Sequence, residues 1–174
     1  MPLEILQGNL LDASTDAIIL QIDGVKRNME GNIARSFARK WPDAWEEIED
    51  EIPYPLSLGR ICTIELSNEC GFRFVIVAST LHHQDTLSEG AKKSVVRTAL
   101  QNALQAAAKH NIGSIGSAIM TGGWRLSQES ALMAMSEGYE GALRLGLTIT
   151  LSIYILDAAD FQRLNDFFRS LGWK

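Results

Sequence analysis

The sequence predicts an α/β fold in which strands and helices pack as a layered sandwich around a mixed sheet of roughly six strands. The first observation is the element order β-β-α-β-β-α-β-α-β-α, in which strand-like runs alternate with amphipathic helical stretches. The second is that two pairs of strands follow one another directly, which argues against a purely parallel sheet. The third is length: 174 residues, 46% of them hydrophobic, suffice for one domain spanning 1–174.

In the first half of the chain, hydrophobic spacing predicts two early strands and two consecutive helices. The strands are expected at 3–6 and 17–22, where apolar residues run together. Apolar residues at i, i+4 and i+8 predict a helix over 33–41. Pro42 ends this helix and opens the next one, because proline fits the first turn of a helix but not its interior. The two prolines of 51–59 then predict a loop.

The second half continues with a hairpin and three further helices, of which the second starts after a possible cap at Ser127. The strands are predicted at 60–66, 72–78, 114–120 and 147–155, and the helices are centred on 96–107, 132–142 and 161–171. The run 147–155 alternates strictly, which indicates a strand with one strongly apolar face.

Composition excludes several classes of function. A net charge of −5 argues against binding to nucleic acid or to an acidic membrane surface, and no apolar run approaches the ~20 residues of a membrane span. Neither cysteine lies in a CxxC pair, and the N-terminus carries no basic region followed by an apolar block, so a cytoplasmic protein is expected. The chain contains no P-loop lysine, no Rossmann glycine motif and no GxSxG, so no cofactor is expected.

Two loops after the early strands contain residues that suit a ligand. Asn9, which ends the first strand, could hydrogen-bond a base edge or a sugar, although its pairing with a preceding glycine is also common in turns. Gly31 and Asn32 precede a helix whose first amides could hold a phosphate. Lys26 and Arg27 add local positive charge there. An ordinary surface loop with a glycine turn is the alternative for this second segment.

A third segment places two glycines and a tryptophan at one corner between a strand and a helix. Thr121, Gly122 and Gly123 could let an anion approach the backbone closely. Trp124 could stack on a sugar or base, and Arg125 could pair with a phosphate. Alternatively, Trp124 packs against the neighbouring helix as part of the core.

The run "STLHHQD" raises the question of a metal. His82 and His83 are followed by Asp85, but no HxxxH or HxxE spacing supports a metal site. A pair of polar histidines in a loop is favoured, and no metal is expected.

Several of these stretches together resemble the macro domain family, which binds ADP-ribose. The matching stretches are "LQGNLLDASTDAIIL", "GNIARSFARKWPDAWEEIEDE", "LGRICTIEL", "SIGSAIMTGGWRLSQESA" and "IYILD". The resemblance covers most of the chain and rests on element order and short matches rather than on one motif. It implies a three-layer α/β/α sandwich, and its implied partner is an ADP-ribose-like small molecule or an ADP-ribosylated target.

The resemblance also implies a set of ligand-binding residues. Asn9 takes the place of the family's aspartate that accepts from the adenine amino group, Gly31 to Ile33 form the first phosphate loop, and Thr121 to Gly123 form the second. Trp124 occupies the aromatic position near the distal ribose. The full set of implied ligand-binding residues is Asn9, Leu10, Asp23, Gly31, Asn32, Ile33, Thr121, Gly122, Gly123, Trp124 and Leu156.

The chain departs from the family's pattern at several of these positions. Residues 20–23, Leu-Gln-Ile-Asp, replace the family's Asn-Ala-Ala-Asn, so Asp23 is the only candidate acid or base in that run. Glu30 would repel a diphosphate, and Arg125 replaces a glycine and narrows the second loop.

These departures leave three hypotheses. The first is a module that binds ADP-ribose or a related nucleotide. The second is a scaffold, as a homo-oligomer or an interaction domain, that has lost nucleotide binding. The third is an ADP-ribosyl hydrolase in which Asp23 activates water.

Overall fold

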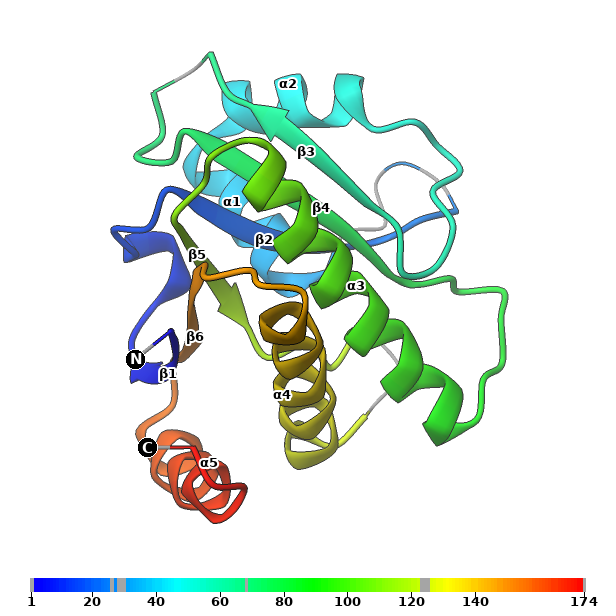
Figure 1. Ribbon diagram of the computed structural model, residues 1–174. Helices are drawn as coiled ribbons and strands as arrows, with labels where there is room; N and C mark the ends of the chain where they lie inside the picture. The colour runs from blue at the N-terminus through cyan, green and yellow to red at the C-terminus, as the bar shows by residue number, and fades with distance from the viewer. Residues whose placement is uncertain (1, 26, 28–30, 68, 123–125, 174) are drawn as a thin grey trace.

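The chain folds around a six-stranded sheet with helices on both faces (Figure 1). The computed structural model describes residues 2–25, 27, 31–67, 69–122 and 126–173. The elements in chain order are β1 (Leu3–Gln7), the short 3-10 helix η1 (Leu10–Asp12), β2 (Ala17–Asp23), α1 (Asn32–Lys40), α2 (Pro42–Glu51), β3 (Ile61–Glu65), β4 (Phe74–Leu81), α3 (Glu89–Lys109), β5 (Ser114–Ala118), α4 (Gln128–Arg144), β6 (Thr150–Ile155) and α5 (Ala158–Ser170).

The sheet is mixed, as predicted, with the strand order β1-β6-β5-β2-β4-β3. All neighbouring strands are parallel except β3, which pairs antiparallel with β4 at one edge. The antiparallel pair follows from the short connection between these strands, because a parallel pairing needs a longer crossover.

The two earliest strands do not pair with each other. β1 lies at one edge and pairs with β6, so that β6 and β5 separate it from β2. The sheet is mixed, as expected, but only the later pair of consecutive strands, β3 and β4, makes it so. The hydrophobic spacing of β1 and β2 cannot show whether these two strands pair with each other. Their pairing depends on where β5 and β6, which come later in the chain, join the sheet.

Two hydrophobic cores, one on each face, make the molecule a three-layer sandwich. On one face α3, α4 and α5 pack on the sheet, and on the other α1 and α2 do so. β2 shows the division clearly: Ile19 belongs to the first core, whereas Ile18 and Leu20 belong to the second. A strand that is buried on both faces is typical of a parallel sheet covered by helices.

The predicted strand over 147–155 begins three residues later than expected, at Thr150. The preceding apolar residues end α4 instead: the amide of Gly146 donates to Leu143, the amide of Leu147 donates to Ala142, and Gly146 has a φ of 79°. This is a helix C-terminus closed by a glycine in the left-handed conformation. The strictly alternating run 147–155 therefore covers both the turn that closes α4 and the strand β6.

The parallel strands bring several loops to one edge of the sheet. β2, β5 and β6 run in the same direction, so the segments that follow them emerge at the same edge, where ligands collect in open α/β sheets. Within the part of the chain that the structure describes, no helix is long and apolar enough to cross a membrane.

Candidate functional site

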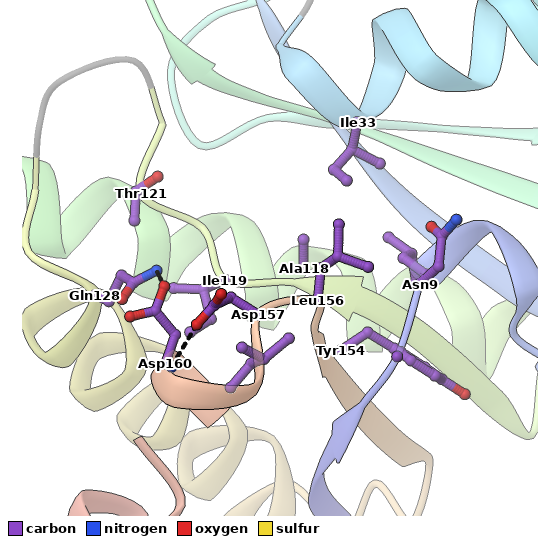
Figure 2. A pocket seen from close by; sticks show the side chains of 13 residues that line it. Asn9, Ile33, Ala118, Ile119, Thr121, Gln128, Tyr154, Leu156, Asp157 and Asp160 are labelled. Atoms are coloured by element: carbon purple, nitrogen blue, oxygen red, sulfur yellow. Dashed lines mark hydrogen bonds between the residues drawn. The ribbon is translucent and has the colours of Figure 1, made fainter. Parts of the chain in front are cut away.

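Two adjoining cavities lie at the carboxyl edge of the parallel strands. The larger, here called the Tyr154 cavity, has a volume of about 290 Å³ and extends from Asn9 and Tyr154 to Asp160 (Figure 2). The smaller, here called the Gly31 cavity, has a volume of about 230 Å³ and is lined by both glycine-bearing corners. The residues that line both cavities are Ile33, Ala118, Ile119 and Thr121. The two therefore share a wall.

The first corner is the start of α1. Gly31 is the N-cap residue, and no side chain of the described residues caps this helix. The amide of Gly31 donates to the carbonyl of Gln21 at 3.1 Å, which fixes the corner against β2. The amides of Asn32 and Ile33 belong to the first turn, where N–H groups have no partner within the helix. Both residues line the Gly31 cavity, at the positive end of the helix dipole.

The second corner follows β5. The amide of Thr121 donates to the carbonyl of Ile119 at 3.0 Å, and Gly122 has a φ of 64°. A residue with a side chain rarely adopts this conformation, so glycine is required here. Gly31, Asn32, Ile33, Thr121 and Gly122 all line the Gly31 cavity, so the two corners face one hollow.

Asn9 lies at one end of the Tyr154 cavity (Figure 2), and Leu10 also lines this cavity. The Asn9 side-chain oxygen accepts from the amide of Leu11 at 3.0 Å and caps η1. That oxygen keeps a second lone pair, and the amide nitrogen keeps two hydrogens. Leu10 is 2% exposed and packs in the core below the cavity. Of these two residues, Asn9 is the one whose polar side chain a ligand can reach.

Tyr154 and Leu156, at the end of β6, provide the apolar surface of the Tyr154 cavity. Leu156 is 76% exposed, which is unusual for a large apolar side chain in this molecule. Tyr154 is half-buried, and burial, followed by the nearby carboxylate of Glu4, raises the pKa of its phenol. The phenol is therefore neutral at physiological pH and can both donate and accept a hydrogen bond.

The opposite end of the Tyr154 cavity is acidic (Figure 2). Asp157 caps α5 by accepting from the amide of Asp160 at 2.9 Å. Both carboxylate oxygens of Asp160 are engaged, one by Gln128 at 3.3 Å and one by Arg163 at 2.9 Å. Asp157 and Asp160 are the only charged side chains among the described residues that line the two cavities.

Asp23 lines neither cavity. Its side chain is completely buried, where one oxygen accepts from the amide of Val25 and the other faces the ring and amide of His83. His82 makes separate contacts, with the carbonyl of Leu56 at 2.9 Å and with Asp85 at 3.2 Å. Among the residues that the structure describes, no group of three or more potential metal ligands gathers.

Six further residues were singled out near the two corners, of which the structure describes Arg27. Arg27 forms an exposed ion pair with Asp50 at 3.4 Å and lines neither cavity. The other residues singled out near the two corners lie outside the described part of the chain; they are Lys26, Glu30, Gly123, Trp124 and Arg125.

Sequence reasoning missed Tyr154 and the acidic end of its cavity. The alternation of β6 places Ile153 and Ile155 in the first core and Tyr154 on the other face, where it is half-buried against the second core. The sequence did carry one signal for Tyr154: it is an aromatic residue on the face of the predicted strand that is otherwise polar. Gln128, Asp157 and Asp160 meet across two helix starts that are far apart in sequence, and nothing local predicts that meeting.

Comparison with solved structures identifies the fold. No family model and no curated protein matches the sequence. The Oceanobacillus iheyensis macrodomain with ADP superposes with a TM-score of 0.80 at 14% identity, over 96% of this chain and 90% of that one. A mutant of the same macrodomain with ADPR gives 0.75 at 14%, over 99% and 94%.

The macrodomain of Mycobacterium tuberculosis DarG gives a TM-score of 0.69 at 20% identity, over 89% of this chain and 98% of that one. These likenesses agree with the mixed six-stranded sheet and with the helix layers on its two faces. The resemblance predicted from the sequence is thus confirmed at the level of structure: the chain has the macrodomain fold.

Proposed function

We propose that this protein binds ADP-ribose or a related nucleotide across the two adjoining cavities. The observation that carries the proposal is that two backbone corners, at Gly31 and at Gly122, line one cavity that continues into a second. Solved macrodomains that contain ADP or ADPR support the same choice of ligand class.

The diphosphate would occupy the Gly31 cavity. The described lining of that cavity carries no acidic side chain, and the first amides of α1 point their dipoles at it. It also carries no lysine or arginine, so backbone N–H groups are the main donors. Such a cradle recognises an anion by shape and hydrogen bonding rather than by side-chain charge.

The nucleoside would occupy the Tyr154 cavity. Asn9 offers an amide that can donate to and accept from the edge of a base, and Tyr154 and Leu156 offer apolar surface for its face. Asp157 keeps one carboxylate oxygen beyond the one that caps α5, and it can accept from a hydroxyl or an amino group. The acidic end disfavours a phosphate there and therefore orients the ligand.

Isothermal titration with ADP-ribose tests this proposal, with adenosine and inorganic pyrophosphate as half-ligands. We expect ADP-ribose to bind more tightly than either half, because each half fills only one cavity. The absence of heat at millimolar ADP-ribose would remove the proposal and favour a scaffold.

A further inference from the structure

We propose that Asp157 selects nucleotides whose ribose hydroxyls are free, so that the Tyr154 cavity rejects nucleotides with a phosphate on the 2′ or the 3′ oxygen. This inference rests on the proposed function, because it needs the nucleoside to lie in that cavity. It names a class of ligand that the site excludes, and it assigns the exclusion to one carboxylate at the start of α5.

Asp157 has a carboxylate oxygen that is available to a ligand. Its Oδ1 accepts from the amide of Asp160 at 2.9 Å and caps α5, which fixes the orientation of the carboxylate (Figure 2). No other hydrogen bond and no ion pair joins this side chain to the rest of the described chain, and the residue is exposed. Oδ2 can therefore accept from a hydroxyl group in the cavity that Asp157 lines.

The negative charge at this end of the cavity is not balanced by the nearest cation. Arg163 donates to Asp160 at 2.9 Å, and it also pairs with Glu129 in the first turn of α4. One guanidinium thus faces two carboxylates before Asp157 is counted. Within the described part of the chain no lysine or arginine lines either cavity, so an additional phosphate on the ribose would meet no counter-ion there.

The boundaries of the cavity indicate which part of a nucleoside meets Asp157. Three parts of a nucleotide leave the ribose ring in different directions: the base, the 5′ carbon with its phosphates, and the edge that carries the 2′ and 3′ hydroxyls. The Tyr154 cavity has three matching boundaries, namely the Asn9 end, the wall shared with the Gly31 cavity, and the acidic end (Figure 2). With the base at Asn9 and the diphosphate in the Gly31 cavity, the hydroxyl edge is directed at the acidic end.

A free hydroxyl and a phosphate ester behave differently at this carboxylate. A hydroxyl donates its hydrogen to Oδ2 of Asp157, and a hydrogen bond to a charged acceptor is stronger than one between neutral groups. A phosphate on the same ribose oxygen removes that hydrogen and adds a charge of about −1.5 to −2 at neutral pH. The ester therefore loses the hydrogen bond and meets like charge. An acidic residue that accepts from the ribose 2′ hydroxyl distinguishes NAD from NADP in dinucleotide-binding folds by the same physics.

The first experiment compares two pairs of ligands by titration calorimetry. The pairs are ADP-ribose with 2′-phospho-ADP-ribose, and ADP with 3′-phosphoadenosine 5′-diphosphate. We expect each phosphorylated ligand to bind at least about tenfold more weakly than its partner, because it exchanges a hydrogen bond for repulsion. Equal affinity within either pair would overturn the inference.

The ionic strength then separates charge from shape in the parent protein. Salt screens exposed charges, so the ratio of the two affinities should fall between about 50 mM and 500 mM sodium chloride. A ratio that salt leaves unchanged would mean that the additional phosphate is excluded by its size, and it would overturn the role of Asp157.

The second experiment measures the same ratio in Asp157→Asn. Asparagine has nearly the same size and is as good a helix cap as aspartate, so the cap of α5 is kept while the charge is removed. We expect the ratio between ADP-ribose and 2′-phospho-ADP-ribose to fall by at least about fivefold, mainly because the phosphorylated ligand binds more tightly.

The matched control is Asp166→Asn, which removes the same charge from an exposed position about two and a half turns further along α5 and lines neither cavity. It should leave the ratio as it is in the parent protein. An unchanged ratio in Asp157→Asn, or an equal fall in Asp166→Asn, would show that Asp157 is not the selecting residue.

The outcomes separate the two proposals. Equal binding of ADP-ribose and 2′-phospho-ADP-ribose overturns the selection by Asp157 and leaves the binding function standing. Failure of ADP-ribose itself to bind removes both. Should Asp157→Asn not fold, the salt dependence of the ratio in the parent protein decides.

Discussion

The two adjoining cavities share a wall but are built from different parts of the chain. The Tyr154 cavity is formed by side chains that differ in character from end to end, with Asn9 and Tyr154 at one end and Asp157 at the other. The Gly31 cavity is formed by two backbone corners and has no charged side chain in its described lining. Under the proposed function, selectivity for the nucleoside would therefore depend on residue identity, whereas anion binding would depend on the path of the backbone.

The largest effect is expected where the two cavities meet. Ala118 lines both, and it is a small, half-buried residue at the end of β5. A phenylalanine there fills the junction, so Ala118→Phe should weaken ADP-ribose binding by at least about 100-fold, which corresponds to roughly 2.8 kcal/mol. Titration calorimetry measures the loss, and Ala159→Phe, on an exposed position of α5, is the matched control. Undiminished binding to Ala118→Phe would show that the ligand does not cross the junction.

The second-largest loss of affinity is expected for ligands that occupy the Tyr154 cavity. Tyr154→Ala removes an aromatic surface that is worth about 1 to 2 kcal/mol in burial and contact, so ADP-ribose and adenosine should both bind about tenfold more weakly. Pyrophosphate should be unaffected, because it does not need this surface. An equal loss for pyrophosphate would contradict the division between the two cavities.

A smaller loss of affinity is expected for a change at the Gly31 corner, and there it should affect pyrophosphate rather than adenosine. A Cβ added at Gly31 would lie 3.1 Å from the carbonyl oxygen of Gln21, so Gly31→Ala displaces the start of α1 by a few tenths of an ångström. We expect ADP-ribose and pyrophosphate to bind about fivefold more weakly and adenosine to bind unchanged. Gly90→Ala is the control, since a Cβ there meets nothing within 4 Å. Should adenosine lose affinity as much as pyrophosphate, the anion does not lie at this corner.

The smallest effect concerns stability. Asp157→Ala removes the cap of α5 and should lower the free energy of unfolding by about 1 kcal/mol, or the melting temperature by about 2 to 4 °C. Ser88→Ala, which removes the cap of α3 away from both cavities, should do the same. Only Asp157→Ala should also change the affinity for adenosine. Differential scanning calorimetry with and without adenosine separates the two variants, and identical ligand responses would argue against Asp157 as a contact.

Much of the fold could be predicted from the sequence because it depends on local periodicity. The strands, the two helices that meet at Pro42 and the cap Ser127 each follow from residues that are close in sequence. What could not be predicted is long-range pairing. The placement of β1 beside β6, rather than beside β2, depends on contacts between residues about 150 positions apart.

In the candidate site, too, features that depend on local sequence could be predicted, and features that depend on long-range contacts could not. The corners at Gly31 and Gly122 could be predicted because glycine before or after a helix has a local conformational meaning. Tyr154 could not, since its place at the cavity depends on how β6 packs against a core whose other members are far away in sequence. The burial of Asp23 against His83 depends on the pairing between the ends of β2 and β4, and it leaves Asp23 outside the lining of both cavities.

A crystal structure of the protein soaked with ADP-ribose would show directly whether one ligand spans both cavities. We expect the diphosphate against the amides of Asn32, Ile33 and Gly122, with the adenine between Asn9 and Tyr154. A ligand bound wholly inside one cavity, reversed with its adenine at Gly31, or seated elsewhere on the molecule would contradict it.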